Sequence, residues 1–304
     1  MKYEVDNLSI LRNISASDVQ LHPYPHVMIR DALPDDIYKD MEDSFPDLRS
    51  LYEGDPDFGS KAFVDFGSDV VKRAGTSNSW RSFLDYHMKK SFFDDFIRVF
   101  SDHIDSVFPD LERSLNTKIS DFVVVTRDDE TARIRQTQSQ DQIENADHDV
   151  AMSNAIALGF THNNPRVHAG PHLDRTYKLF SSLLYMRDPK DSSEGGDLIL
   201  HKLKDPSRLR KNRVIYTSVG RHFKDNIVEE VVRIPYEKNI AVIFLNSPNS
   251  IHGVTSRTPT KIPRRAVYIN AEVSKITGFY SCIDDEARRP VNRLKKVIKR
   301  IISL

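Results

Sequence analysis

The sequence contains a single cysteine, Cys282, among 304 residues. One thiol can form neither an internal disulfide nor a cysteine-rich metal site, so any metal would have to be held by histidines and carboxylates. No apolar run reaches the roughly 20 residues that span a bilayer. The first residues also lack the basic start and the apolar core that are typical of a signal peptide. We therefore expect a soluble, cytoplasmic protein.

The formal net charge of the whole chain is zero, but the charges are unevenly distributed along it. Residues 201–304 contain 22 basic and 9 acidic residues, which leaves an equal acidic excess in residues 1–200. A basic third of the chain can face an anionic substrate or a phosphate-bearing surface, although solvated faces that happen to segregate give the same pattern. Aromatic residues are not interleaved with the basic ones, so we expect no nucleic-acid partner.

We expect a single domain over residues 1–304, in three parts. Residues 1–120 form a mixed, largely helical support region, with a strand near 26–30, a helix over 33–45 and one long helix or two shorter ones over 79–115. Residues 121–275 form the catalytic core. Residues 276–304 form a basic amphipathic helix, because apolar residues share one face there and lysines and arginines share the other.

The core is expected to consist of many short strands without intervening helices, which is typical of a sandwich or jelly roll. Apolar runs separated by glycine, proline, asparagine and aspartate lie at residues 122–126, 154–160, 179–186, 197–201, 227–235, 239–246 and 265–273. The polar stretch 128–151 has almost no apolar periodicity and is expected to be a long loop or an edge hairpin.

Three residues of the core form a candidate metal site. His172 and Asp174 lie two residues apart, and in a strand such a pair points to the same face. His252 closely follows the apolar run 239–246 and could lie at the mouth of that strand. Each residue alone is more often an ordinary surface or core residue. Together, two histidines and one carboxylate with open coordination positions form the facial triad of non-haem Fe(II) oxygenases, although zinc uses the same donors.

The order of motifs around these residues is more specific than the triad. His-x-Asp is followed by an apolar strand that ends at Tyr185, by a Gly-Gly turn into "DLIL", and by a strand that leads to His-Gly-Val and then to arginine. Over about residues 154–273 this order resembles the Fe(II)- and 2-oxoglutarate-dependent dioxygenases, particularly their prolyl-hydroxylase-like branch. The resemblance implies a mixed α+β, mainly β fold with a double-stranded β-helix (jelly-roll) core and N-terminal helices packed outside it. It also implies Fe(II) as the metal, 2-oxoglutarate and O₂ as cosubstrates, and hydroxylation of a C–H bond.

Carried over residue by residue, the resemblance implies His172, Asp174 and His252 as the catalytic iron ligands. Arg264 would bind the 2-oxoglutarate carboxylate, since a guanidinium grips a carboxylate through two parallel hydrogen bonds. Tyr185 and Ser181 would assist it from the same strand face. Only one of Arg264 and Arg265 can face inward in a regular strand, and Arg265 is the alternative. Arg257 also has a claim, because the spacing from His252 to Arg264 is longer than the family's usual one.

The substrate is the least determined feature. The basic stretch 201–213 and the basic terminal helix favour a small anionic molecule or a glycolipid, such as a sugar of the inner core of lipopolysaccharide, with peripheral contact of the helix with an anionic membrane. A prolyl or other protein side-chain hydroxylase shares the same core residues. A non-catalytic metal-binding jelly-roll protein would not require Arg264 and Tyr185. The oligomeric state stays open.

Overall fold

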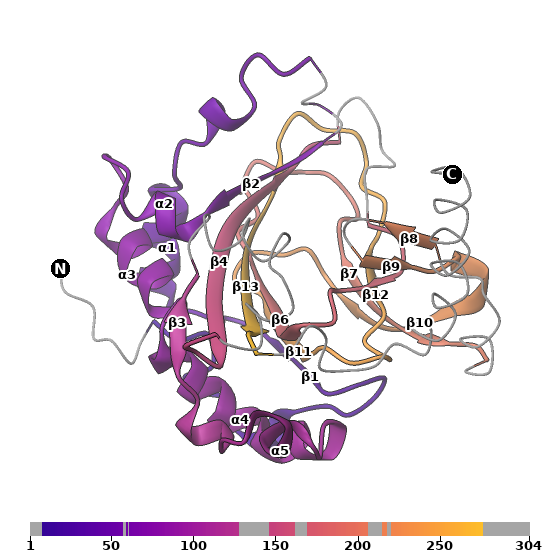
Figure 1. The fold of residues 1–304 in the computed structure, drawn as a ribbon. Coiled ribbons are helices and arrows are strands. Elements are labelled where there is room, and N and C mark those ends of the chain that lie inside the picture. The colour runs from indigo at the N-terminus through magenta and orange to yellow at the C-terminus, as the bar shows by residue number, and fades with distance from the viewer. Residues whose placement is uncertain are drawn as a thin grey trace, which may run out of the picture.

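The computed structural model describes residues 8–56, 59, 61–127, 146–161, 169–205, 215–217 and 220–275. Their strands form two sheets that pack face to face, with the helices on the outer side of the larger sheet (Figure 1). Apolar side chains from both sheets meet between them, among them Leu183 and Phe244 from the large sheet and Leu200 from the small one. This arrangement confirms the predicted jelly-roll core.

The strands of each sheet are not in chain order, as a jelly roll requires. The large sheet has the order β1 (His26–Ile29), β11 (Ala241–Leu245), β6 (Lys178–Tyr185), β13 (Arg264–Val273), β4 (Val150–Gly159) and β2 (Ala62–Phe66), and β3 (Val124–Thr126) pairs in parallel with β4. The small sheet has the order β10 (Val228–Ile234), β7 (Leu198–Leu203), β12 (His252–Val254), β5 (His172–Leu173), β9 (Gly220–His222) and β8 (Ile215–Thr217).

Helices cover the outer face of the large sheet (Figure 1). They are α1 (Asp35–Asp43), α2 (Gly67–Val70), α3 (Asn78–Tyr86), α4 (Lys90–Val107) and α5 (Leu111–Leu115), with short 3₁₀ turns η2 (Ala16–Asp18), η3 (Arg49–Leu51) and η5 (Ile119–Asp121). A further 3₁₀ turn, η7 (Asp225–Ile227), precedes β10 of the small sheet. The long amphipathic helix α4 buries aromatic residues against the sheet, including Phe96, whose ring centroid lies 4.3 Å from that of Phe180 on β6. Such contacts anchor the sheet that carries part of the site.

The helical region after residue 78 differs from the prediction of one or two helices, because it forms three. The first ends at Tyr86, where the backbone of His87 turns out of the helical conformation, and Pro109 lies just before the third. Proline lacks the amide hydrogen that a helix interior requires, so it separates α4 from α5. Apolar periodicity continues across both interruptions, which is why the sequence pattern did not reveal them.

Side chains alternate strictly on β4. Its even-numbered residues, such as Met152 and Ile156, are buried against the helices. Its odd-numbered residues face the other way, toward the small sheet, because they pair with the β13 positions that carry Ala266 of the inter-sheet core. All of these inward-facing residues are small: Ala151, Ser153, Ala155, Ala157 and Gly159. The inner face is therefore thinly filled over β4.

Other predictions have mixed outcomes. The strands expected in the core are all present, but β4 begins at Val150, so the expected loop 128–151 is too long by two residues. Strands β1 and β2 come from the predicted support region and extend the large sheet. The stretch 128–145, most of the basic stretch 201–213 and the terminal helix 276–304 lie outside the described residues. Within the described residues, no helix has both the length and the apolar character to cross a bilayer.

Candidate metal centre

His172, Asp174 and His252 converge in the structure. Each offers one possible ligand atom, and these three atoms all lie within 4.8 Å of one another. His172 and His252 are cross-strand partners on β5 and β12, which brings their ring centroids to 4.3 Å. Nε2 of His252 lies 4.0 Å from Oδ2 of Asp174. The three side chains could therefore hold one metal ion.

Both histidines are held in the tautomer that a metal requires. Nδ1 of His172 lies 2.8 Å from the carbonyl oxygen of Gly170, and Nδ1 of His252 lies 2.9 Å from that of Ser250. A carbonyl only accepts, so each Nδ1 carries a proton, and Nε2 is the ring nitrogen that is left to bind a metal. Burial, with the nearby His172, lowers the pKa of His252 to about 3, which keeps its imidazole neutral at physiological pH.

Asp174 is ionised in this setting. Burial alone would raise its pKa, but Lys178, the two histidines and Ser181 outweigh burial and hold the pKa well below its usual range. Its Oδ2 accepts a hydrogen bond from Ser181 Oγ at 2.5 Å and lies 3.2 Å from Nζ of Lys178. Two neutral imidazoles and one carboxylate suit a divalent transition metal.

The backbone around the triad differs from the prediction in two ways. Asp174 lies just after β5, so the pair is not held within one regular strand. His252 does not lie at the mouth of β11 but begins its own short strand in the opposite sheet, between β7 and β5. The reason is the turn at 246–251, which carries the chain from the large sheet to the small one. All three side chains thus come from the small sheet and its adjoining loop.

Arg264 lies inside the jelly roll. Its residue is 9% exposed, its Nε donates to the carbonyl of Gly196 at 2.8 Å, and one terminal nitrogen donates to Tyr185 Oη at 2.9 Å. The guanidinium also packs over the rings of Tyr185 and Tyr236, at 4.8 and 5.2 Å from their centroids. Burial raises the pKa of Tyr185 to about 12, so its hydroxyl keeps its proton. Among the described residues, no carboxylate is paired with Arg264.

The two other candidate arginines have acidic partners. Arg265 points out of the jelly roll, where it lies 2.7 Å from Asp188. Arg257 is fully buried, and its side chain forms an ion pair with Asp191 at 2.6 Å. The glycine turn before β7 lies against both buried arginines, and both of its glycines have positive φ angles, +80° at Gly195 and +84° at Gly196, which other residues rarely adopt.

Ser181 faces inward, as Tyr185 does, but its hydroxyl contacts Asp174, whereas that of Tyr185 contacts Arg264. Two further residues at the triad were missed. Lys178 is four residues after Asp174, a spacing that could have pointed to it, and Asn246 donates to Ser181 Oγ at 3.0 Å. No sequence signal indicates Asn246, because its contact depends on the pairing of β11 with β6.

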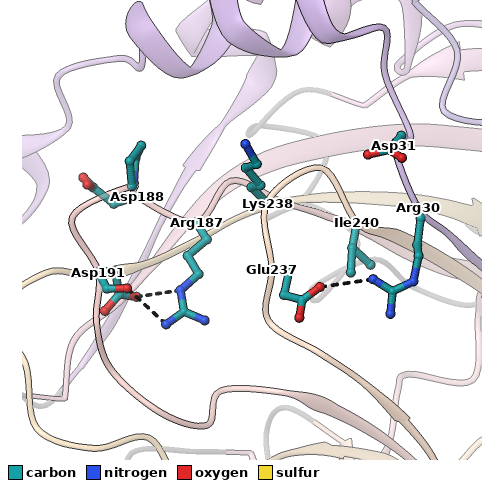
Figure 2. A pocket seen from close by; sticks show the side chains of 9 residues that line it. Arg30, Asp31, Arg187, Asp188, Asp191, Glu237, Lys238 and Ile240 are labelled. Carbon is teal, nitrogen blue, oxygen red and sulfur yellow. Dashed lines mark hydrogen bonds and ion pairs between the residues drawn. The ribbon is translucent and has the colours of Figure 1, made fainter.

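A separate cavity of about 450 Å³ lies where β6 ends, at the opposite end of this strand from Ser181 (Figure 2). Figure 2 shows two ion pairs in its lining: Arg187 reaches Asp191, and Arg30 lies 3.1 Å from Glu237. The lining also contains Asp31, Asp188 and Lys238, and it contains none of the triad residues.

The sequence and the structure were also compared with those of known proteins. No protein-family model matches the sequence, and no curated protein matches it. Among solved structures, the chain is similar to prolyl 4-hydroxylases from Phytophthora capsici, with 13% identity, a TM-score of 0.46, and coverage of 91% of this chain and 69% of that one. A prolyl-4-hydroxylase from Pseudomonas putida matches with 11% identity, a TM-score of 0.42, and coverage of 85% and 98%. A prolyl hydroxylase from Trichoplax adhaerens, in complex with a peptide fragment, matches with 13% identity, a TM-score of 0.40, and coverage of 86% and 90%. Such low values establish no family, so the function has to rest on the side chains.

Proposed function

We propose that the protein is an Fe(II)- and 2-oxoglutarate-dependent oxygenase that hydroxylates a C–H bond. One observation carries this proposal: Arg264 is a buried cation, on the inner face that also carries Ser181 beside the triad, and no carboxylate of the described residues neutralises it. A zinc hydrolase or a non-catalytic metal-binding protein could use the same triad, but neither needs this arginine.

The arginine is a ready binding site for a carboxylate. Burying an unpaired charge is costly, and a bound anion would remove this cost through two parallel charge-assisted hydrogen bonds. Tyr185 Oη accepts one hydrogen bond from Arg264 and still has its own proton to donate. A guanidinium and a hydroxyl side by side can therefore orient the same carboxylate.

The two ends of the site are spaced for a molecule that bridges them. Ser181 touches Asp174 and Tyr185 touches Arg264, and these two residues of β6 are four apart on the same face. Four residues of a strand span about 13 Å. Arg264 lies at one end of that span and a metal ion held by the triad would lie at the other, so a five-carbon dicarboxylate could reach from one to the other.

The residues present fit the metal and cosubstrate. His172, Asp174 and His252 would hold Fe(II), and Arg264 with Tyr185 would hold the distal carboxylate of 2-oxoglutarate. When bound, these groups supply the oxidative decarboxylation that yields succinate and CO₂ and the oxidant for the C–H bond. The chain would orient the cosubstrate, holds the Nδ1 proton of both imidazoles on backbone carbonyls so that Nε2 is available to a metal, and leaves space over the small residues of β4.

The substrate remains a prediction from the sequence: a small anionic compound, such as a sugar of an envelope glycolipid. Its support is the basic stretch 201–213, of which Lys202 already pairs with Glu229 at 2.8 Å. A prolyl or other protein side-chain hydroxylase is the alternative. A peripheral membrane contact through residues 276–304 stays a prediction as well.

The test is succinate formation from 2-oxoglutarate by the purified protein with Fe(II) and O₂. We expect slow formation without a second substrate, and stimulation by the correct substrate class in a panel of anionic sugars, lipopolysaccharide fragments and proline-containing peptides. Asp174→Ala should remove the activity, while the matched control Asp188→Ala, outside the jelly roll, should retain it. Equal succinate formation by wild type and Asp174→Ala would contradict the proposal.

A further inference from the structure

The metal ligands and the large sheet meet at one point. His172, Asp174 and His252 all belong to the small sheet or to the loop after β5. Asp174 lies outside any strand, so no ladder of backbone hydrogen bonds holds it in place. What fixes its carboxylate is contact with side chains of β6, at the start of which Lys178 and Ser181 both reach Oδ2.

The hydrogen bonds through Ser181 run in one direction. Asn246 Nδ2 lies 3.0 Å from Ser181 Oγ, and this oxygen lies 2.5 Å from Asp174 Oδ2. An amide nitrogen only donates and an ionised carboxylate only accepts. The single hydroxyl proton must therefore point at Asp174, and the hydroxyl oxygen accepts from Asn246.

Asn246 is placed rigidly for this role. It follows β11, is 0% exposed, and its backbone nitrogen donates to the carbonyl of Leu179 at 3.0 Å. Its Oδ1 is buried and has no hydrogen-bond partner among the described residues. The hydrogen bond to Ser181 Oγ is therefore the only one that this side chain makes within the described residues.

We propose that Asn246 and Ser181 are positioning residues that hold Asp174 in its metal-binding orientation and so set the affinity of the centre for its metal. The inference rests on the metal-binding half of the proposed function and is independent of 2-oxoglutarate. Partners that orient a ligand typically change metal affinity by about 10- to 100-fold when removed. Asn246 acts through Ser181, so its effect should vanish once the hydroxyl is gone.

The test is anaerobic titration of the full-length protein with Co(II), followed by its visible absorption bands. We expect Ser181→Ala to bind Co(II) about 10- to 100-fold more weakly than wild type and with shifted bands, and Ser181→Thr, which keeps the hydroxyl, to recover most of the affinity. The matched control is Ser182→Ala, since Ser182 is buried on the opposite face of the same strand. It should bind Co(II) as wild type does.

Asn246→Leu separates positioning from general packing. It should weaken Co(II) binding about 3- to 10-fold, and the double variant with Ser181→Ala should bind within about twofold of Ser181→Ala alone. If the losses of Co(II) affinity in the two single variants multiplied in the double variant, the inference would be overturned. A Ser181→Ala variant that binds Co(II) as tightly as wild type would overturn it as well. If Asn246→Leu fails to fold, the Ser181→Ala and Ser181→Thr pair still decides. Wild type that binds no Co(II) would overturn the proposed function first, and this inference with it.

Discussion

Two buried arginines pack against the same ring, that of Tyr236, and differ in what neutralises them. Arg257 lies 5.7 Å from the ring centroid and has Asp191 at 2.6 Å and Ser193 at 2.7 Å. Arg264 lies 5.2 Å from it and has only a carbonyl and a hydroxyl as polar partners in the described part of the chain. A buried charge that is paired within the chain belongs to the fold. One that lacks such a pair among the described residues is the basis of our proposal that an anion from outside binds there.

The largest effect should come from breaking the internal pair. Asp191→Asn removes the carboxylate charge that lies 2.6 Å from the buried Arg257, and we expect the free energy of unfolding to fall by about 3–5 kcal/mol. Urea-induced unfolding at neutral pH measures this. The matched control is Asp188→Asn, whose partner Arg265 is partly exposed, so its loss should stay below about 1 kcal/mol. Equal losses in the two variants would remove the distinction between the arginines.

The corresponding change at the other arginine should affect binding instead of stability. Arg264→Met removes a buried cation that has no acidic partner among the described residues, so the free energy of unfolding should stay within about 1 kcal/mol of wild type or rise. The affinity for 2-oxoglutarate should fall roughly 100-fold, because two charge-assisted hydrogen bonds are lost. Calorimetric titration of the Mn(II)-loaded protein with 2-oxoglutarate measures the affinity, and urea-induced unfolding measures the stability. Unchanged affinity in the folded variant would contradict the role of Arg264.

A smaller effect should follow from Tyr185→Phe. The ring that packs under Arg264 remains, and only the hydroxyl is lost. One hydrogen bond is worth about 1 kcal/mol, so 2-oxoglutarate affinity should fall about fivefold while Mn(II) affinity is unchanged. The same titration provides the measurement. A loss as large as that in Arg264→Met would mean that Tyr185 holds the arginine in place and does not merely assist it.

The smallest effect should come from Arg265→Met. Its ion pair with Asp188 lies on the outside of the jelly roll, with both side chains partly exposed. We expect less than about 1 kcal/mol of lost stability and no change in 2-oxoglutarate affinity. If this variant lost affinity and Arg264→Met did not, the two adjacent arginines would have to exchange roles.

The fold was predictable where the pattern was long. Strands such as β6, β11 and β13 appear in the sequence as apolar runs between turn residues. Because neighbouring residues of a strand face opposite sides, only one of the two arginines that begin β13 can face inward. The family resemblance favoured Arg264 over Arg265, and the register places Arg264 inward, because Arg264 pairs with Gly159 and Ala266 follows it into the core.

The site was predictable in residue type but not in local structure. His172 and His252 belong to strands of two and three residues, which are too short to show any periodicity. Ser181 was assigned to the cosubstrate because it shares a face with Tyr185, yet it contacts Asp174 across the fold. Asn246 depends on the packing of two strands that are distant in sequence, which no local pattern records.

The most direct test of the central claim is anaerobic titration of 2-oxoglutarate into the Fe(II)-loaded protein, observing the weak visible charge-transfer band of the chelate. We expect a band in wild type, none in Asp174→Ala, and in Arg264→Met a band that appears only at roughly 100-fold higher 2-oxoglutarate. A folded, Fe(II)-loaded wild type without any band would contradict the claim that this centre binds both groups together.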